Sequence, residues 1–269
     1  MIPAAFDYHR ATSLEHAAEL LGSLGDEAKV LAGGHSLLPF MKLRFATPSA
    51  LVDIGGVAGH DYVRLDGDVI RIGALTTHRS LSESPVLAEH LPLLSRAAAS
   101  IGDAQIRARG TLGGSVAHAD PAGELPMLCR LLDAQILTTT GAHSAAEFFQ
   151  GRYTTPLADD ELIREVVFPV APQRGEYLKF SHRLYDWALV GVAAQRVGGD
   201  WRIGLVNVSD TPVRALAAEA ALASGASLGE AAALAADGLR PAPSHRASSD
   251  YKVHLTKVLT RRALEQASG

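Results

Sequence analysis

The hydrophobic pattern of the first 55 residues predicts a small α/β lobe. Apolar residues recur there at helical spacing: Leu14, Ala17, Ala18, Leu21 and Leu24. Thr12 and Glu15 have the form of a capping box at the start of that helix. The apolar runs 29–32 and 51–54 are typical of buried strands. The predicted order over residues 1–55 is therefore helix, strand, glycine turn, short helix and strand.

A second, larger α+β lobe is predicted over residues 56–170. It starts with a hairpin, because apolar residues alternate through 62–65 and 69–72 around an Asp66-Gly67 turn. Helices are expected at two places: residues 91–99, with Pro92 in the first turn, and residues 125–132. Strands are expected at three places: residues 105–110, which lead to a second glycine turn, 135–139 and 162–168.

The last third of the chain predicts a separate domain, residues 176–269. Residues 169–175 contain two prolines and a glycine without periodicity, and they are the best linker candidate. Three strand-like stretches follow, at 177–180, 188–193 and 201–206, with a glycine turn at 198–200 between the last two. Alanine-rich helices are expected at 214–223, 228–236 and 250–266. We expect a three-stranded antiparallel sheet with helices.

Composition and charge exclude several classes of protein. The chain has 269 residues, of which 47% are hydrophobic and 20% charged, as in soluble globular proteins. The net charge of −4 and the lack of a Lys/Arg cluster argue against a nucleic-acid surface. No apolar run is long enough to span a bilayer. The N-terminus has no basic region followed by an apolar stretch, so we expect no secretory signal.

The chain has a single cysteine, Cys129. This count excludes an internal disulfide, and it excludes a four-cysteine iron–sulfur cluster or zinc site built by this chain alone. The apolar residues around Cys129 favour a packed core thiol over a reactive one.

Two double-glycine turns, Ala32–Ser36 and Thr111–Ser115, are the most informative motifs. Glycine permits positive φ and removes the Cβ that would block a ligand, and successive backbone N–H groups in such a turn converge on an anion. Two turns that face each other would hold a pyrophosphate from both sides. Two strand-ending turns without a ligand fit the pattern about equally well.

Neither turn matches the usual nucleotide-binding motifs. There is no Gly-x-Gly-x-x-Gly of a Rossmann fold and no Gly-Lys-Ser/Thr of a P-loop. Ser36 either donates its hydroxyl to a phosphate or caps the turn. His35 has no orienting partner nearby in the sequence, which favours a backbone contact over a catalytic role.

The polar segment after the second turn, residues 116–126, is a further candidate. Asp120 either accepts hydrogen bonds from a sugar or ribityl hydroxyl or caps the turn at Pro121. His118 and Glu124 are also metal-ligand types, but the spacing supports no metal site. Tyr185 either covers a planar ring or packs in a hairpin. No acid–base or nucleophile arrangement follows from spacing, so we predict no catalytic residue and no metal site.

Three segments resemble the FAD-binding medium subunit of molybdenum hydroxylases, the xanthine dehydrogenase and carbon monoxide dehydrogenase family. They are AGGHSLLPFMKLR at 32–44, IGDAQIRARGTLGGSVAHADPAGELP at 101–126 and YDWALVGVA at 185–193. Residues 6–10 and 248–264 are similar as well, so the resemblance covers essentially the whole chain in order. It is most like the carbon monoxide dehydrogenase type. Ser115 and Ala11 depart from the family, where asparagine and proline are common.

The resemblance implies an α+β fold: a two-lobed FAD-binding fold followed by a C-terminal domain of three antiparallel strands with helices. It implies that the glycine motifs hold the FAD pyrophosphate, that Asp120 contacts the flavin side, and that Tyr185 lies near the flavin ring. The expected cofactor-binding residues are Ala32, Gly33, Gly34, His35, Ser36, Leu37, Thr111, Gly113, Gly114, Ser115, Asp120 and Tyr185.

The resemblance also implies a function and partners. The chain is expected to take electrons from a small 2Fe-2S subunit through FAD to an external acceptor, while a large subunit with the molybdenum cofactor hydroxylates the substrate. The three-chain unit is expected to pair into a dimer, a heterohexamer, in the cytoplasm, at the inner face of the membrane through its partners. Two alternatives stay open: a stand-alone flavin oxidoreductase of the same fold, and a non-enzymatic nucleotide-binding assembly scaffold.

Overall fold

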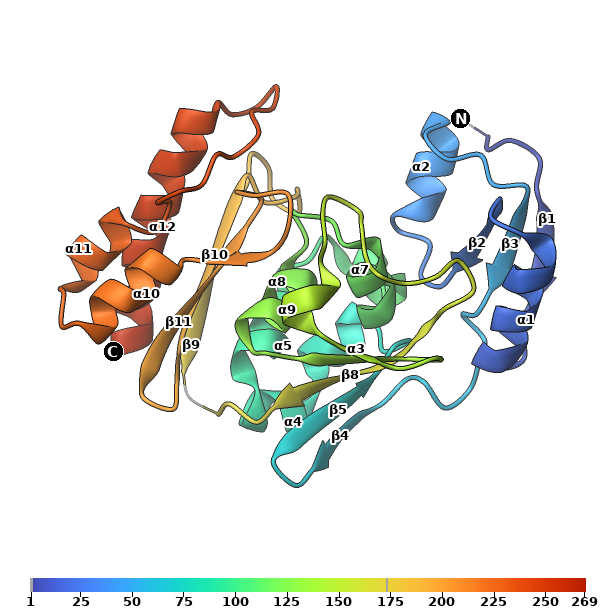
Figure 1. Cartoon of the computed structure of the whole chain (residues 1–269), viewed down its shortest axis with the longest axis horizontal. Coiled ribbons are helices and arrows are strands. Elements are labelled where there is room, and N and C mark those ends of the chain that lie inside the picture. Colours follow the sequence, from blue (N-terminus) through green and yellow to red (C-terminus); the bar gives the residue numbers. More distant parts are fainter. Residues whose placement is uncertain (1, 173) are drawn as a thin grey trace.

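Three separate β-sheets, each with its own helices, follow one another along the chain in the computed structural model (Figure 1). The structure describes residues 2–172 and 174–269. The N-terminal and C-terminal units lie at opposite ends of an elongated molecule, and the central unit lies between them (Figure 1). The central unit therefore contacts both of the others.

The N-terminal unit is a parallel three-stranded sheet in the order β1-β3-β2. Its elements are β1 (Asp7–Arg10), α1 (Leu14–Leu24), β2 (Ala28–Leu31), α2 (Leu37–Leu43) and β3 (Ala50–Asp53). Because the strands are parallel, their carboxyl ends meet at one edge of the sheet. The first glycine turn lies at this edge, directly after β2.

The central unit is an antiparallel five-stranded sheet in the order β4-β5-β8-β6-β7. Its strands are β4 (Val63–Asp66), β5 (Val69–Gly73), β6 (Gln135–Thr138), β7 (Ala142–Ser144) and β8 (Ile163–Pro169). Its helices are α3 (His78–Glu83), α4 (Pro85–His90), α5 (Pro92–Ala99), α6 (Ala104–Arg109), α7 (Leu112–His118), α8 (Glu124–Leu131) and α9 (Ala145–Phe148). The second glycine motif opens α7.

The C-terminal unit is an antiparallel sheet in the order β12-β11-β10-β9. Its elements are β9 (Gly175–Phe180), β10 (Val190–Val197), β11 (Asp200–Val206), β12 (Val213–Arg214), α10 (Leu216–Ala223), α11 (Leu228–Ala233) and α12 (Ser249–Ser268). Helices α10 and α12 pack on the sheet from the outside, whereas α5 and α8 of the central unit contact β9 and β11 (Figure 1). The three predicted antiparallel strands are confirmed, and the short β12 extends their edge.

The hydrophobic cores of the three units interlock. Leu75 and Leu162, from loops of the central unit, are buried in the core of the N-terminal unit. Ala193 and Val206, from strands of the C-terminal unit, are buried in the central core. Each unit therefore contributes apolar side chains to its neighbour, which fixes how the units sit against one another.

Two local predictions were wrong. Residues 105–110 do not form a strand but lie mostly in α6, because the Asp103 side chain accepts hydrogen bonds from the N–H groups of Gln105 and Ile106 and caps a helix there. The cap of α1 is Ser13 rather than Thr12, since the Ser13 hydroxyl accepts from the His16 N–H at 3.0 Å. Both errors concern side chains that bond to a nearby backbone.

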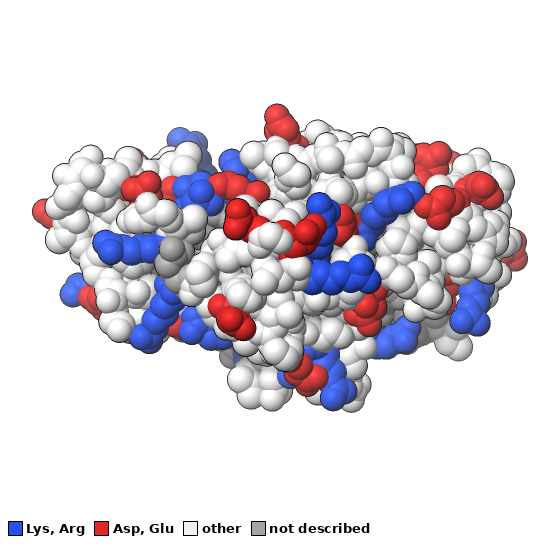
Figure 2. Space-filling model, turned by 90° about the horizontal axis from the view of Figure 1, so that it is seen from below, with Lys and Arg blue, Asp and Glu red and all other residues white. Residues whose placement is uncertain are grey.

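The surface carries charges of both signs. Seen from below, Lys and Arg side chains alternate with Asp and Glu, without one broad patch of a single sign (Figure 2). In the part of the chain that the structure describes, no helix combines the length and the apolar character that crossing a bilayer requires.

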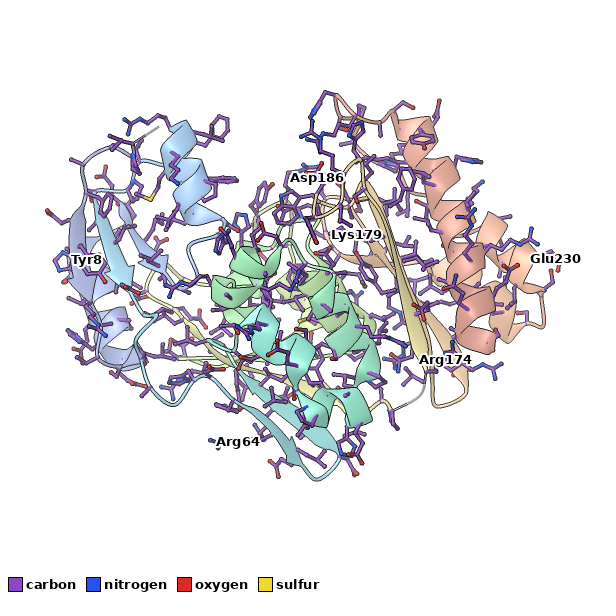
Figure 3. The ribbon with its side chains drawn as sticks, turned by 180° about the vertical axis from the view of Figure 1, so that it is seen from behind. Tyr8, Arg64, Arg174, Lys179, Asp186 and Glu230 are labelled. Atoms are coloured by element: carbon purple, nitrogen blue, oxygen red, sulfur yellow. The ribbon has the colours of Figure 1, made fainter. Side chains whose placement is uncertain are left out.

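A buried ion pair joins the C-terminal unit to the central unit. Lys179 Nζ on β9 lies 2.9 Å from Oε1 of Glu124, which starts α8 and is 2% exposed. Lys179 also donates to the Ser100 carbonyl at 3.3 Å. The Tyr177 hydroxyl faces the same carboxylate, and burial together with that charge raises the pKa of Tyr177. Figure 3 shows Lys179 where the C-terminal sheet faces the central helices.

Replacement of Lys179 by Met should destabilise the protein strongly. Glu124 would stay buried without its cation, and breaking a buried pair from one side costs about 3–5 kcal/mol of unfolding free energy. Urea denaturation measures this loss, and a Glu124→Gln/Lys179→Met double variant should recover part of it. Arg79→Ala, which breaks the exposed Arg79–Glu83 pair, is the control and should cost less than about 0.5 kcal/mol. Equal losses of unfolding free energy in Lys179→Met and Arg79→Ala would contradict a buried ion pair at this junction.

Candidate functional site

The two glycine motifs meet through direct backbone packing. A Cβ on Gly33 would overlap the carbonyl oxygen of Arg109 and approach the Gly110 Cα to 2.9 Å. A Cβ on Gly114 would lie 3.9 Å from the Cβ of Ala32. Only glycine fits at position 33, and its missing side chain lets the edge of the N-terminal sheet touch the junction between α6 and α7.

The first turn presents a row of unpaired backbone donors. Among the described residues, none accepts a hydrogen bond from the N–H groups of Gly33, Gly34, His35 or Ser36. Gly34 has a φ of +75°, a conformation that a side chain would strain. A turn with several free N–H groups in succession is a site for an anion such as a phosphate.

The first backbone N–H groups of the second motif already donate hydrogen bonds within the protein. The Thr111 hydroxyl accepts from the Gly114 N–H at 3.1 Å and caps α7. The Gly113 N–H donates to the Ala74 carbonyl at 2.8 Å, and a Cβ on Gly113 would meet Ala74. The first turn therefore supplies the free donors, while the second contributes a close-packed glycine surface opposite to it.

A hollow of about 130 Å³, open to solvent, lies beside this meeting point. Its lining comes from both units and includes Ala32, Gly55, Asp61, Thr77, Arg109 and Thr111. Gly55 and Gly56 form a third double-glycine turn just after β3, but no hydroxyl residue follows them as it does in the other two motifs. None of Gly33–Ser36 lines the hollow, but Ala32, directly before them, does. The free N–H groups of the turn and the Arg109 guanidinium suit an anionic ligand such as a phosphate.

His78 is buried against Gly110, where the two motifs meet. It is 6% exposed, its N–H donates to the Gly110 carbonyl at 2.9 Å, and a Cβ on Gly110 would come within 2.6 Å of its Nε2. Burial, with smaller contributions from His35 and Arg107, lowers the pKa of His78 to about 4. Its Nδ1 meets no hydrogen-bond partner among the described residues. A neutral imidazole therefore fills the space that Gly110 leaves open.

Both oxygens of the Asp120 carboxylate accept hydrogen bonds. Oδ1 accepts from the Ala122 N–H at 2.8 Å, and Oδ2 accepts from the Tyr153 hydroxyl at 3.4 Å. The turn-capping role is thus present, and contact with a ligand stays a prediction. His118 stacks on Tyr153 with ring centroids 4.9 Å apart, and burial lowers the pKa of His118. Among the described residues, no three His, Cys, Asp or Glu side chains lie close enough to share a metal ion.

Tyr185 is an exposed residue with a left-handed backbone conformation. It belongs to the β9–β10 loop, is 58% exposed and has a φ of +71°. The next residue, Asp186, pairs with Arg246 at 2.5 Å, and Figure 3 shows Asp186 on the side of the C-terminal unit that faces the central helices. The role of Tyr185 at a flavin ring stays a prediction.

Comparison with known families and relatives covers the whole chain. Residues 4–171 match the family model of the FAD binding domain in molybdopterin dehydrogenase, and residues 176–267 match the CO dehydrogenase flavoprotein C-terminal domain. The carbon monoxide dehydrogenase medium chain of Hydrogenophaga pseudoflava is 39% identical, over 99% of this chain and 98% of the relative. The glyceraldehyde dehydrogenase medium chain of Sulfolobus acidocaldarius is 33% identical over the full length of both chains.

Solved structures share the complete fold. A chain of carbon monoxide dehydrogenase from Hydrogenophaga pseudoflava superposes with a TM-score of 0.93 at 41% identity, covering 100% of this chain and 99% of that chain. A chain of quinoline 2-oxidoreductase from Pseudomonas putida 86 gives a TM-score of 0.92 at 32% identity, with 100% and 98% coverage.

The fold and the site together define an FAD-binding flavoprotein of the oxidoreductase class. The chain belongs to the family of FAD-binding medium subunits of molybdopterin dehydrogenases, with the C-terminal domain of the carbon monoxide dehydrogenase flavoproteins. The family, the fold class and FAD as the cofactor, all expected from the resemblance, are confirmed.

Gly33→Ala should weaken FAD binding. The added Cβ overlaps the Arg109 carbonyl, so the two glycine motifs must separate, and the FAD dissociation constant should rise at least about tenfold, or about 1.4 kcal/mol. Flavin absorbance per chain after gel filtration measures the loss. Gly141→Ala is the control, because a Cβ there meets open space. Full flavin content in the Gly33 variant would show that the contact is dispensable.

The buried His78 should make stability depend on pH below neutrality. Between its folded pKa of about 4 and its ordinary value of 6.5, the unfolded chain binds more protons than the folded chain. The contribution of His78 to the unfolding free energy should therefore be complete above pH 6.5. It should fall by about 3 kcal/mol as the pH drops to 4. Urea titrations at several pH values measure the unfolding free energy against pH. Its fall below pH 6.5 should be less steep for His78→Gln than for the wild type. Identical slopes for both proteins would refute a buried neutral imidazole.

Proposed function

We propose that this chain is the electron-transfer subunit of a heteromeric molybdenum hydroxylase, which takes electrons from an iron–sulfur subunit and passes them to an external acceptor. The row of free N–H groups at Gly33–Ser36, held against Arg109 beside the hollow, is the observation that carries this proposal. FAD supplies the redox chemistry when it is bound, and the residues of this chain bind and orient it.

The proposal assigns a role to each part of the chain. Residues 1–55 and 56–170 form the two lobes around the cofactor, and residues 176–269 form the C-terminal domain. The N–H groups of the first turn hold the pyrophosphate, and Thr111–Ser115 face it from the other side. Asp120 accepts hydrogen bonds from the ribityl hydroxyls, and Tyr185 covers the flavin ring.

The names of the relatives support substrate chemistry in another chain. Three of them are subunits of dehydrogenases for carbon monoxide, glyceraldehyde and 6-hydroxypseudooxynicotine, and each matches 99% or more of this chain. These substrates share little chemistry, whereas the subunits share one sequence pattern from end to end. A pocket that selects among such substrates therefore belongs to a partner, which we propose is a large subunit with the molybdenum cofactor.

The proposed assembly is a unit of three chains: this chain, the large subunit and a small 2Fe-2S subunit, with two such units paired into a dimer. We place it in the cytoplasm, at the inner face of the membrane through its partners. Exposed apolar residues suited to docking occur in separate parts of the surface: Phe45, Leu184 and Leu216. A stable contact of this kind buries more than about 1,000 Å².

Co-expression of the chain with its two neighbouring subunits tests the proposal. The three chains should co-elute in size-exclusion chromatography with one FAD per copy of this chain. Acid precipitation should release all the flavin, because the site holds it through hydrogen bonds and packing.

The alternatives give different results in the same experiment. Oxidation of an organic substrate by this chain alone, free of molybdenum and iron, would indicate a stand-alone oxidoreductase. A folded complex without flavin would indicate an assembly scaffold. Elution of the chain as a yellow monomer, with both partners present and folded, would contradict the electron-transfer role.

A further inference from the structure

The loop at Asp120 is held by residues with unusual backbone conformations. Ala119, Tyr153 and Asn207 have φ values of +50°, +57° and +62°. The Tyr153 N–H donates to the Ala119 carbonyl at 3.3 Å, and the Asn207 N–H donates to the Pro121 carbonyl at 2.8 Å. Left-handed backbone at non-glycine residues costs energy and persists where the surroundings enforce it, commonly at ligand sites.

The ring of Tyr153 joins the N-terminal unit to the central unit. It lies 4.9 Å from the His118 ring at the end of α7 and 6.2 Å from the Phe40 ring on α2, measured between centroids. Phe40 and His118 also meet edge to face at 5.6 Å. Helix α2 follows the first glycine turn and α7 begins with the second, so this aromatic cluster spans the two elements that carry the motifs.

The hydroxyl of Tyr153 fixes the direction of the Asp120 carboxylate. Burial and the nearby Asp120 charge raise the pKa of Tyr153, so the hydroxyl keeps its proton at neutral pH and donates to Oδ2. Oδ1 is held by the Ala122 N–H. Each carboxylate oxygen accepts one hydrogen bond and retains a second acceptor site.

We propose that Tyr153 is a positioning residue of the cofactor site: its hydroxyl orients Asp120 to accept hydrogen bonds from the hydroxyls of the FAD ribityl chain. The ring of Tyr153 keeps α2 against the end of α7 while the carboxylate is held. This inference rests on the proposed function, because it takes Asp120 as a ligand of FAD. No local sequence pattern links the two residues, since Tyr153 and Asp120 are 33 positions apart.

Tyr153→Phe in the three-chain complex is the first test. The variant keeps the aromatic contacts and removes only the hydroxyl. After FAD removal and titration with FAD, followed by flavin fluorescence, its dissociation constant should be about fivefold to tenfold higher. The visible circular dichroism of the bound FAD should also change. Tyr62→Phe is the matched control, because it removes a tyrosine–carboxylate hydrogen bond of 2.7 Å to Glu165 within the central unit, and it should leave both readouts unchanged.

A double-mutant cycle tests whether Tyr153 acts through Asp120. If it does, Tyr153→Phe/Asp120→Asn should bind FAD no more weakly than Asp120→Asn alone, whereas independent roles would multiply the two losses. Multiplied losses, or an unchanged affinity and spectrum in Tyr153→Phe, would overturn the inference while leaving the proposed function intact. A wild-type complex that takes up no FAD would instead overturn the proposed function, and this inference with it.

Discussion

The structure of the site depends on one contact between two stretches of backbone. Gly33 packs against Arg109 and Gly110 so closely that a single Cβ would overlap a carbonyl oxygen. This contact sets the sheet edge of the N-terminal unit against the start of α7, and it places the free N–H groups of the first turn beside the hollow. His78 supports the contact from behind, since its ring fills the space beside Gly110. Gly33 thus serves the packing of the two units against each other.

Interlocked cores keep that contact in place. Leu75 and Leu162 extend from the central unit into the N-terminal core, and Val206 extends from the C-terminal sheet into the central core. The buried Lys179–Glu124 pair adds a directional link between β9 and α8, close to the Asp120 loop. A ligand site between two units is precise only where the units cannot slide. Groups that are already held lose little freedom when a ligand binds.

Periodic segments and glycine turns could be predicted from the sequence, whereas contacts across the chain could not. The 14–24 helix and the 63–73 hairpin carry clear periodicity, and both were found. The six residues before the second turn were misassigned because a short apolar run fits a strand or a helix, and the deciding hydrogen bonds come from Asp103. Tyr153 was missed altogether, because only the fold brings it to Asp120.

The proposed cofactor site at Gly33–Ser36 is made mainly of backbone. The N–H groups of Gly33–Ser36 do not titrate, and His78, with its pKa near 4, stays neutral at physiological pH. In the proposed site, the attraction for a pyrophosphate comes mainly from fixed peptide dipoles, and Arg109 is the charged side chain nearby. A chain that is 32% identical retains a TM-score of 0.92. A site of this kind constrains few side chains, so the rest of the sequence can diverge while the site is kept.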